Sequence, residues 1–335
     1  MSGAKNGPET GIRFATAPSA AVARKTRIPV PITPQHWRRI VPEGPEIRRV
    51  ATRIHKVLAG REAEQVVFTQ PGVAGFGPKL SGQQVQWVSS RGKALLTHFE
   101  GGLTVYSHNQ LYGRWYVTRR DKPPATNRTL RLAIHTRTHS ALLYSASDIE
   151  VLTPEELPLQ KYLARLGPDV LDDEVTWREV LARLQAPAFA GRSLAALYLD
   201  QGFVAGIGNY LRSEILFNAK VNPFDRPKDL SRKQLGALAR NTLDLTRQAY
   251  QTSGVTNTAA RVKRLQSQGV SRRHYRFLAF DREEQPCYHC QDTVVRLEVS
   301  GRRIYLCPTC QPALRAPAPR SAPNPAHLPL PKEAK

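Results

Sequence analysis

The sequence predicts a multidomain α+β protein: a β-rich N-terminal domain with a leading helix, a mainly helical domain, and a small C-terminal metal-binding finger. Three observations support this. Short β-rich runs separated by turns fill about residues 63–149, helical periodicity takes over from about residue 153, and all four cysteines lie between residues 287 and 310. The 335-residue chain is 41% apolar, enough for two modest domains with their own cores.

An amphipathic helix is expected at the start of the β-rich domain. The segment PEGPEIRRVATRIHKVLAG predicts a helix that opens at Pro45 and stops at Gly60. Its apolar stripe consists of Ile47, Val50, Ile54, Val57 and Leu58. Residues 1–41 lack such a pattern, so we expect a disordered extension that is either non-native or cleaved.

The β-rich domain is expected to cover residues 42–152. Apolar runs at 93–99, 103–109, 131–135 and 141–145, with a turn at Gly101-Gly102, indicate a β-sandwich or a barrel.

The helical domain is expected to follow over residues 153–275. Capping-box patterns at Thr176…Glu179 and Ser231…Gln234 mark helix starts, and the polar, Arg-rich residues 253–274 are expected to form a flexible loop. Seven prolines among residues 312–335 predict a disordered tail.

The charge of the chain favours a polyanionic partner. The net charge is +22, and residues 1–40 and 312–335 together account for +9, so residues 41–311 still hold +13. A basic folded body gains affinity for nucleic acid through the counterions that phosphates release. A generally basic proteome is the alternative. No stretch reaches the roughly 18 to 20 apolar residues that a membrane span needs, so we expect a soluble protein.

The cysteines predict a zinc-ribbon finger over residues 276–311. Two CxxC pairs are separated by sixteen residues, a spacing that lets four thiolates surround one tetrahedral zinc ion: Cys287, Cys290, Cys307 and Cys310. The residues between them read as two strands that turn at Ser300-Gly301 and include Arg296, Arg302 and Arg303. Two disulfides or a redox CxxC are the alternatives.

Three further segments are ambiguous when taken singly. Lys93 enters a strand and could be an ordinary solvated side chain, and Gln110-Leu111-Tyr112 at a strand-to-turn corner could be edge-strand packing. Asn209 follows three glycines at a helix start, where exposed backbone N–H groups would suit a phosphate, although a tight interhelical turn explains the glycines equally well.

In order and spacing, the segments together resemble the formamidopyrimidine-DNA glycosylase/endonuclease VIII family, over about residues 42–311. They are PEGPEIRR, RGKALLTHF, YSHNQLYG, LLYSASDIE, LGPDVLD, GIGNYLRSEIL and the finger. PEGPE and QLYG are similar to the endonuclease VIII branch.

The resemblance implies a β-sandwich, a helix-two-turn-helix domain and a zinc finger with one structural zinc ion. It also implies a bifunctional DNA glycosylase/AP lyase of base excision repair. Pro42 would be the Schiff-base nucleophile, Glu43 the proton donor, Lys93 a participant in β-elimination and Arg302 in δ-elimination. Gln110, Leu111 and Tyr112 would form the wedge that replaces a flipped nucleotide, and Gln110, Arg165 and Asn209 would contact DNA.

The substrate implied is double-stranded DNA with oxidised bases or abasic sites. The branch suggests oxidised pyrimidines and leaves purines open. The protein would act as a monomer in a bacterial cytoplasm, associated with the nucleoid. The chemistry is consistent with this, because the positive end of the helix that begins at Pro45 disfavours an ammonium at Pro42 and tolerates Glu43 as an anion.

One departure from the family pattern concerns Pro42, which is preceded by Val41 rather than by an initiator methionine. A valine codon GTG can also initiate translation in bacteria, so we expect the true start at Val41, or else a leader removed by cleavage after Val41. Two other functions remain alternatives: a relative that binds damaged DNA without lyase chemistry, and a zinc-ribbon RNA-binding protein.

Overall fold

The computed structural model describes residues 41–314. The predictions for residues 1–40 and for most of the proline-rich tail therefore lie outside the described residues. None of the helices in the part that is described is both long and apolar enough to cross a membrane.

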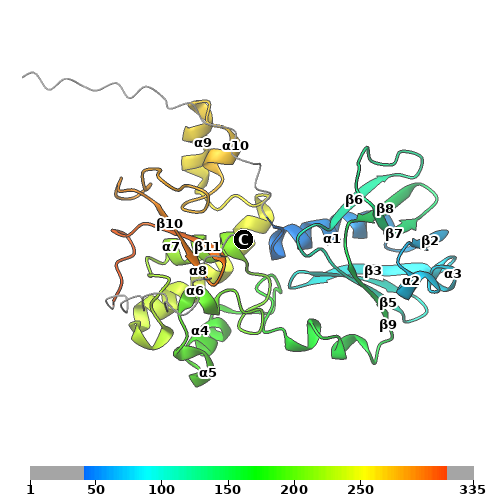
Figure 1. Ribbon diagram of the computed structural model, residues 1–335, viewed down its shortest axis with the longest axis horizontal. Coiled ribbons are helices and arrows are strands. Elements are labelled where there is room, and N and C mark those ends of the chain that lie inside the picture. Colours follow the sequence, from blue (N-terminus) through cyan, green and yellow to red (C-terminus); the bar gives the residue numbers. More distant parts are fainter. Residues whose placement is uncertain (1–40, 315–335) are drawn as a thin grey trace, which may run out of the picture. The chain divides into compact units, whose positions relative to one another are not determined.

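The N-terminal domain is a β-sandwich of two antiparallel sheets, so the sandwich and not the barrel is formed (Figure 1). One sheet has the strand order β1-β3-β4-β5-β9 and the other the order β2-β7-β8-β6. The bounds are β1 Arg61–Glu62, β2 Gln65–Phe68, β3 Gln84–Arg91, β4 Ala94–Phe99, β5 Thr104–His108, β6 Arg114–Arg119, β7 Leu130–His135, β8 His139–Tyr144 and β9 Asp148–Leu152. Two short helices, α2 (Pro71–Ala74) and α3 (Gly77–Leu80), follow β2.

The leading helix α1 (Gly44–Leu58) shares its core with the sheets. Three residues of the predicted stripe, Ile47, Ile54 and Leu58, are buried, whereas Val50 and Val57 are only partly buried. Burying these side chains against the strands fixes the helix start, with Pro45 in its first turn as expected. The first residues of α1 are thereby held at one place on the domain.

The helical domain is organised around α7 (Asn209–Asn218), in which every residue from Tyr210 to Phe217 is buried. The other helices of this part of the chain are η1 Leu157–Leu159, η2 Leu163–Arg165, α4 Trp177–Gln185, α5 Pro187–Ala190, α6 Leu194–Leu197, η3 Pro227–Asp229 and α8 Arg232–Gln251. Both predicted helix starts are confirmed: Thr176 accepts the N–H of Glu179, and Ser231 and Gln234 form both bonds of a capping box.

The Arg-rich stretch expected as a loop is instead largely helical. It contains α9 (Ala259–Ser267) and α10 (Arg272–Tyr275). The reason is local: Thr258 caps α9 by accepting the N–H of Arg261, and the sequence AARVKRLQ consists mostly of good helix formers. Polar composition was mistaken for the absence of secondary structure.

The finger is a hairpin of β10 (Val295–Val299) and β11 (Arg302–Leu306), with Ser300 and Gly301 in left-handed conformations at the predicted turn. It packs against α7, where the Tyr305 N–H donates to the Ser213 hydroxyl. Since α7 belongs to the helical domain, its contacts also fix the position of β11.

Candidate active site and metal centre

The first residues of α1 form the centre of the candidate site. Pro42 is half-buried, and Glu43 is the helix N-cap, with its N–H donating to Glu46 Oε2 at 3.2 Å. Glu46 is held in turn by the Tyr210 hydroxyl at 3.1 Å and the Arg276 guanidinium at 3.1 Å. The backbone beside Pro42 is therefore braced from two other parts of the chain.

The Glu43 side chain points away from its own helix and caps α7. It is only 3% exposed, and its carboxylate accepts the N–H groups of Gly208 (2.7 Å), Tyr210 (2.8 Å) and Leu211 (3.2 Å). The expectation that these N–H groups are exposed and free for a phosphate is wrong. A carboxylate of the same chain already occupies the positive end of this helix.

Glycines make this approach between α1 and α7 possible. A Cβ on Gly208 would lie 2.5 Å from the Glu43 carboxyl carbon, and one on Gly44 would lie 3.0 Å from the Gly206 backbone. The two segments also share a backbone hydrogen bond, from the Gly44 N–H to the Gly206 carbonyl at 2.7 Å. Close contact between the segments thus explains the glycines better than a loop for phosphate.

Glu43 and Lys93 are a pair of opposite charges, of which Glu43 is buried and Lys93 is half-buried. Burial raises the pKa of Glu43 from 4.5 to about 7, while the positive charge of Lys93 and the N–H donors oppose that rise. Burial lowers the pKa of Lys93, opposed by the charge of Glu43. Lys93 Nζ donates to the Ile207 carbonyl at 2.6 Å. The Glu43 carboxyl can exchange its proton near neutral pH, and burial favours the neutral amine of Lys93. Both groups are therefore suited to acid and base catalysis.

Two residues without a predicted role hold Lys93 in place. Asp169 accepts the Gly92 N–H at 2.7 Å, and the Tyr162 hydroxyl accepts the Lys93 N–H at 2.8 Å. Asp169 belongs to the segment LGPDVLD, which contributed to the family resemblance, but neither residue had a signal of its own. Arg165 is exposed at the end of η2, with its guanidinium 5.6 Å from the Tyr162 ring centroid.

A buried arginine of α7 joins Asn209 to strand β11, which begins at Arg302. Arg212 is fully buried and donates to Asn209 Oδ1 at 3.4 Å and to the Arg303 carbonyl at 2.8 Å. Arg302 is exposed at the start of β11, and its charge contributes to the lowered pKa of Lys93. The structure therefore brings Glu43, Lys93 and Arg302 within electrostatic range of one another.

The predicted wedge is an exposed turn. Leu111 is 58% exposed and Tyr112 71% exposed, which is unusual for large apolar side chains without a partner. The Gly113 N–H closes the turn on the Asn109 carbonyl, and a Cβ on Gly113 would lie 2.6 Å from that oxygen. This exposure argues against edge-strand packing of these residues.

Two side chains from outside the turn hold the wedge. Arg128 donates to the Tyr112 carbonyl at 2.5 Å, and the Ser147 hydroxyl donates to Gln110 Oε1 at 3.2 Å. Gln110 itself has a positive φ of 48°, so the turn is defined by its backbone as well as by these contacts.

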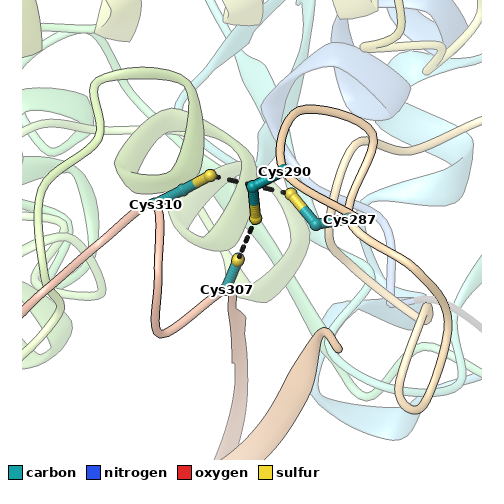
Figure 2. Close-up of side chains that lie close together, drawn as sticks. All are labelled: Cys287, Cys290, Cys307 and Cys310. Carbon is teal, nitrogen blue, oxygen red and sulfur yellow. Dashed lines mark hydrogen bonds between the residues drawn. The ribbon is translucent and has the colours of Figure 1, made fainter. Parts of the chain in front are cut away.

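The four cysteines converge on one point, as Figure 2 shows. Their sulfur atoms all lie within 4.8 Å of one another, with Cys287 and Cys310 3.8 Å apart and Cys290 and Cys307 3.4 Å apart. Four sulfurs at about 2.3 Å from a tetrahedral zinc ion would be about 3.8 Å apart, whereas disulfide sulfurs are separated by about 2.05 Å. The cysteines are free, so the cluster fits a metal ion and not two disulfides.

Comparisons with known proteins match most of the chain. Residues 41–147 match the formamidopyrimidine-DNA glycosylase N-terminal domain, and residues 166–260 match the formamidopyrimidine-DNA glycosylase H2TH domain. Endonuclease 8 of Escherichia coli strain UMN026 is 45% identical over 271 residues, which cover 81% of this chain and 100% of the relative. Endonuclease 8 of Shigella sonnei strain Ss046 is 44% identical with the same coverage.

Solved structures show the same fold. Lactococcus lactis formamidopyrimidine-DNA glycosylase bound non-covalently to DNA with an AP site superposes with a TM-score of 0.66 at 19% identity, covering 81% of this chain and 99% of that one. The complex of the Lactococcus lactis protein with DNA containing an oxidised pyrimidine gives a TM-score of 0.67 at 19% identity, covering 81% and 100%.

Proposed function

This chain belongs to the formamidopyrimidine-DNA glycosylase/endonuclease 8 family of DNA glycosylase/AP lyases in base excision repair, and from this premise we propose that it removes oxidised pyrimidines through Pro42. The backbone is then cut by β,δ-elimination. The observation that supports this most is the electrostatic interaction of Glu43, the buried residue after Pro42, with the half-buried Lys93. In two solved structures the Lactococcus lactis protein is bound to DNA with an AP site or with an oxidised pyrimidine, which is the substrate class proposed here.

The reaction begins with extrusion of the damaged nucleotide. An enzyme cannot reach C1′ of a stacked nucleotide, and unstacking costs a few kcal/mol. Leu111 and Tyr112 are the exposed side chains suited to fill the gap, and Gln110 beside them can pair with the orphaned base. Arg165 and Asn209 contact the flanking DNA backbone.

Pro42 then acts as the nucleophile. Its amine nitrogen attacks C1′ and loses its proton, the glycosidic bond breaks, and the base leaves with the bonding electrons and a proton. Glu43, with a pKa of about 7, holds a proton to donate at neutral pH. The sugar ring then opens: the C1′–O4′ bond breaks, O4′ takes up a proton, and an iminium forms between Pro42 and C1′.

Strand cleavage follows from the same intermediate. The iminium withdraws electrons and acidifies the C2′ proton; its removal expels the 3′-phosphate, and a second elimination expels the 5′-phosphate. Lys93 takes part in the first elimination, because its lowered pKa favours a neutral amine. Arg302 assists the second from the β11 hairpin.

The metal ion in the cysteine cluster is proposed to be zinc, held by Cys287, Cys290, Cys307 and Cys310. Four thiolates in tetrahedral arrangement are the donor set of structural zinc sites. The ion takes no part in the reaction; it ties together the two ends of the hairpin that includes Arg302.

Borohydride trapping on an abasic duplex tests this function. A polypeptide that begins at Pro42 should form a covalent protein–DNA adduct, because borohydride reduces the iminium to a stable amine. The same polypeptide should excise an oxidised pyrimidine from a single-lesion duplex. Binding without an adduct would instead indicate a damage-binding relative without lyase chemistry, and preference for RNA would favour the zinc-ribbon RNA-binding alternative.

A further inference from the structure

Helices α9 and α10 lie side by side and form a helical hairpin over residues 258–276, called the basic hairpin below (Figure 1). It lies in a segment of unusual charge. Residues 245–280 contain no acidic residue and seven basic ones: Arg247, Arg261, Lys263, Arg264, Arg272, Arg273 and Arg276. The roles assigned above to the active site leave the hairpin without a function.

Four of these cations are exposed, and one of them, Arg272, donates to the Ser253 carbonyl at 2.5 Å. Lys263, Arg264 and Arg273 are exposed, and none of the residues of α9 is fully buried. Within residues 41–314, Lys263 and Arg264 form no ion pair, and Arg273 reaches Asp281 only at 4.0 Å, with both side chains largely exposed. Such a long, solvated pair contributes little, so all three charges remain available to a partner.

The hairpin is attached to the finger by a contact at the metal centre. The guanidinium groups of Arg261 and Arg282 lie 4.8 Å and 3.4 Å from the ring centroid of Tyr288. Tyr288 stands between Cys287 and Cys290 in sequence, so this cation–π contact joins α9 to the first cysteine pair. Arg261 also donates to Asn257 Oδ1 at 2.8 Å, which fixes the start of α9.

A second attachment joins the hairpin to α1. Arg276, at its C-terminal end, pairs with Glu46 at 3.1 Å and donates to the Gly254 carbonyl at 2.6 Å. Glu46 in turn accepts the N–H of Glu43, the residue after the nucleophile. The hairpin therefore contacts both the finger, which includes Arg302, and α1, which begins two residues after Pro42.

We propose that the basic hairpin is a second DNA-binding surface, which contacts backbone phosphates of the duplex beyond the lesion through Lys263, Arg264 and Arg273. The inference rests on the proposed function, because DNA held at Pro42 and Arg302 brings its flanking phosphates to elements attached to this hairpin. Cations on exposed helical residues provide charge without base recognition, so the contacts are independent of sequence.

The test compares two variants that lose the same net charge. Lys263, Arg264 and Arg273 are replaced by Gln in one protein, and Lys228, Arg232 and Lys233, exposed cations near the start of α8, are replaced by Gln in the other. The probe is a duplex with a stable abasic analogue, and affinity is measured between about 50 and 200 mM salt. Each lost phosphate contact makes the negative slope of log K against log[salt] shallower by about 0.9. The slope of the hairpin variant should therefore be shallower than that of the wild type by roughly 2.7 if all three cations contact phosphates.

The control variant should keep the wild-type slope. Circular dichroism and metal content should match the wild type for both variants, and single-turnover excision at saturating enzyme should be unchanged for the hairpin variant, because its residues do not touch the reacting atoms. A wild-type slope in the hairpin variant, or equal losses in both variants, would overturn the inference. A protein that begins at Pro42 and binds this duplex, yet neither excises an oxidised pyrimidine from a lesion duplex nor forms a trapped adduct on an abasic duplex, would contradict the proposed function instead.

Discussion

At the scale of single residues, the proposed mechanism gives Glu43 two tasks that place opposite demands on its protonation. As the cap of α7 it accepts three N–H groups, which favour the charged carboxylate. As a proton donor it must be protonated, which burial favours. The balance between them places its pKa at about 7, where both forms are populated at neutral pH.

This balance predicts the pH dependence of base excision. A carboxyl with a pKa of about 7 holds its proton below that pH and loses it above, so excision should fall as pH rises through about 7. Glu43→Gln should lower the single-turnover excision rate by about 10²–10⁴-fold and abolish that pH limb. Cleavage of a preformed abasic site, where no base has to leave, should suffer less.

The thermal stability of Glu43→Gln must be measured together with its excision rate. Glutamine offers one acceptor oxygen to the N–H groups of α7 where the carboxylate offers two. A variant that unfolds at the wild-type temperature yet keeps the pH limb near 7 would show that another group donates the proton.

Substitutions of Lys93 and of Asn209 should have separate effects, the first on catalysis and the second on DNA binding. Lys93→Ala should lower the single-turnover rate by about 10²–10⁴-fold with little change in non-specific DNA affinity, since its amine lies beside Glu43. Asn209→Ala should weaken binding and leave the rate at saturating enzyme nearly unchanged. If both variants lost only affinity, the role of Lys93 in elimination would be wrong.

At the scale of elements, the wedge turn depends on a neighbouring segment. Arg128 lies just before β7 and donates to the Tyr112 carbonyl, so it restrains the turn without touching its side chains. A wedge that is held in shape before binding loses less conformational entropy when it enters the duplex.

We therefore expect Leu111→Ala and Arg128→Ala to impair the same step. Both should reduce excision of a paired lesion more than cleavage of an abasic site, because the abasic site needs less unstacking. The double variant should lose little more than Leu111→Ala alone, since the contacts act on one element. Equal losses on the two substrates would indicate that Leu111 and Arg128 serve only in packing.

The fold of the finger should depend on the proposed zinc ion. Cys290→Ser should weaken DNA binding and cleavage together, because loss of a ligand loosens the hairpin that includes Arg302 and the attachment of the basic hairpin at Tyr288. Metal content by mass spectrometry and protease sensitivity of α9 report this independently of activity. Full activity in a protein shown to be metal-free would contradict it.

The elements differ in how well the sequence predicts them. The helix caps at Thr176 and Ser231, the turn at Ser300-Gly301 and the cysteine cluster depend on neighbouring residues or fixed spacing, so they could be predicted. The segment 253–274 was taken for a loop because its charge conceals a helix of good helix formers.

At the scale of the whole molecule, the contacts that could not be predicted join distant parts of the chain. Glu43 caps a helix 165 residues away, and Asp169 holds a backbone N–H 77 residues before it. No local pattern specifies such a pair, so the sequence suggested a phosphate where the structure has a carboxylate. The family resemblance predicts which residues belong to the site, but not what orients them.

The last prediction concerns the first residue of the active enzyme, because the proposed chemistry requires a free secondary amine at Pro42. In the printed sequence Val41 precedes Pro42, and a proline nitrogen in an amide has no free lone pair with which to attack C1′. Two proteins should be compared. One is expressed from Met1, and the other is expressed from residue 41 with Val41→Met, so that removal of this initiator methionine leaves Pro42 as the first residue. Borohydride trapping on an abasic duplex is measured alongside the intact mass of each protein.

We expect the protein that starts at Pro42 to form the adduct efficiently. The protein from Met1 should form it only to the extent that its mass shows cleavage after Val41. Peptide mapping of the adduct should place the DNA on Pro42. Efficient trapping by a protein whose mass still includes residues 1–41 would mean that another amine attacks C1′, and Lys93, a half-buried lysine with a lowered pKa, would then be the first to test.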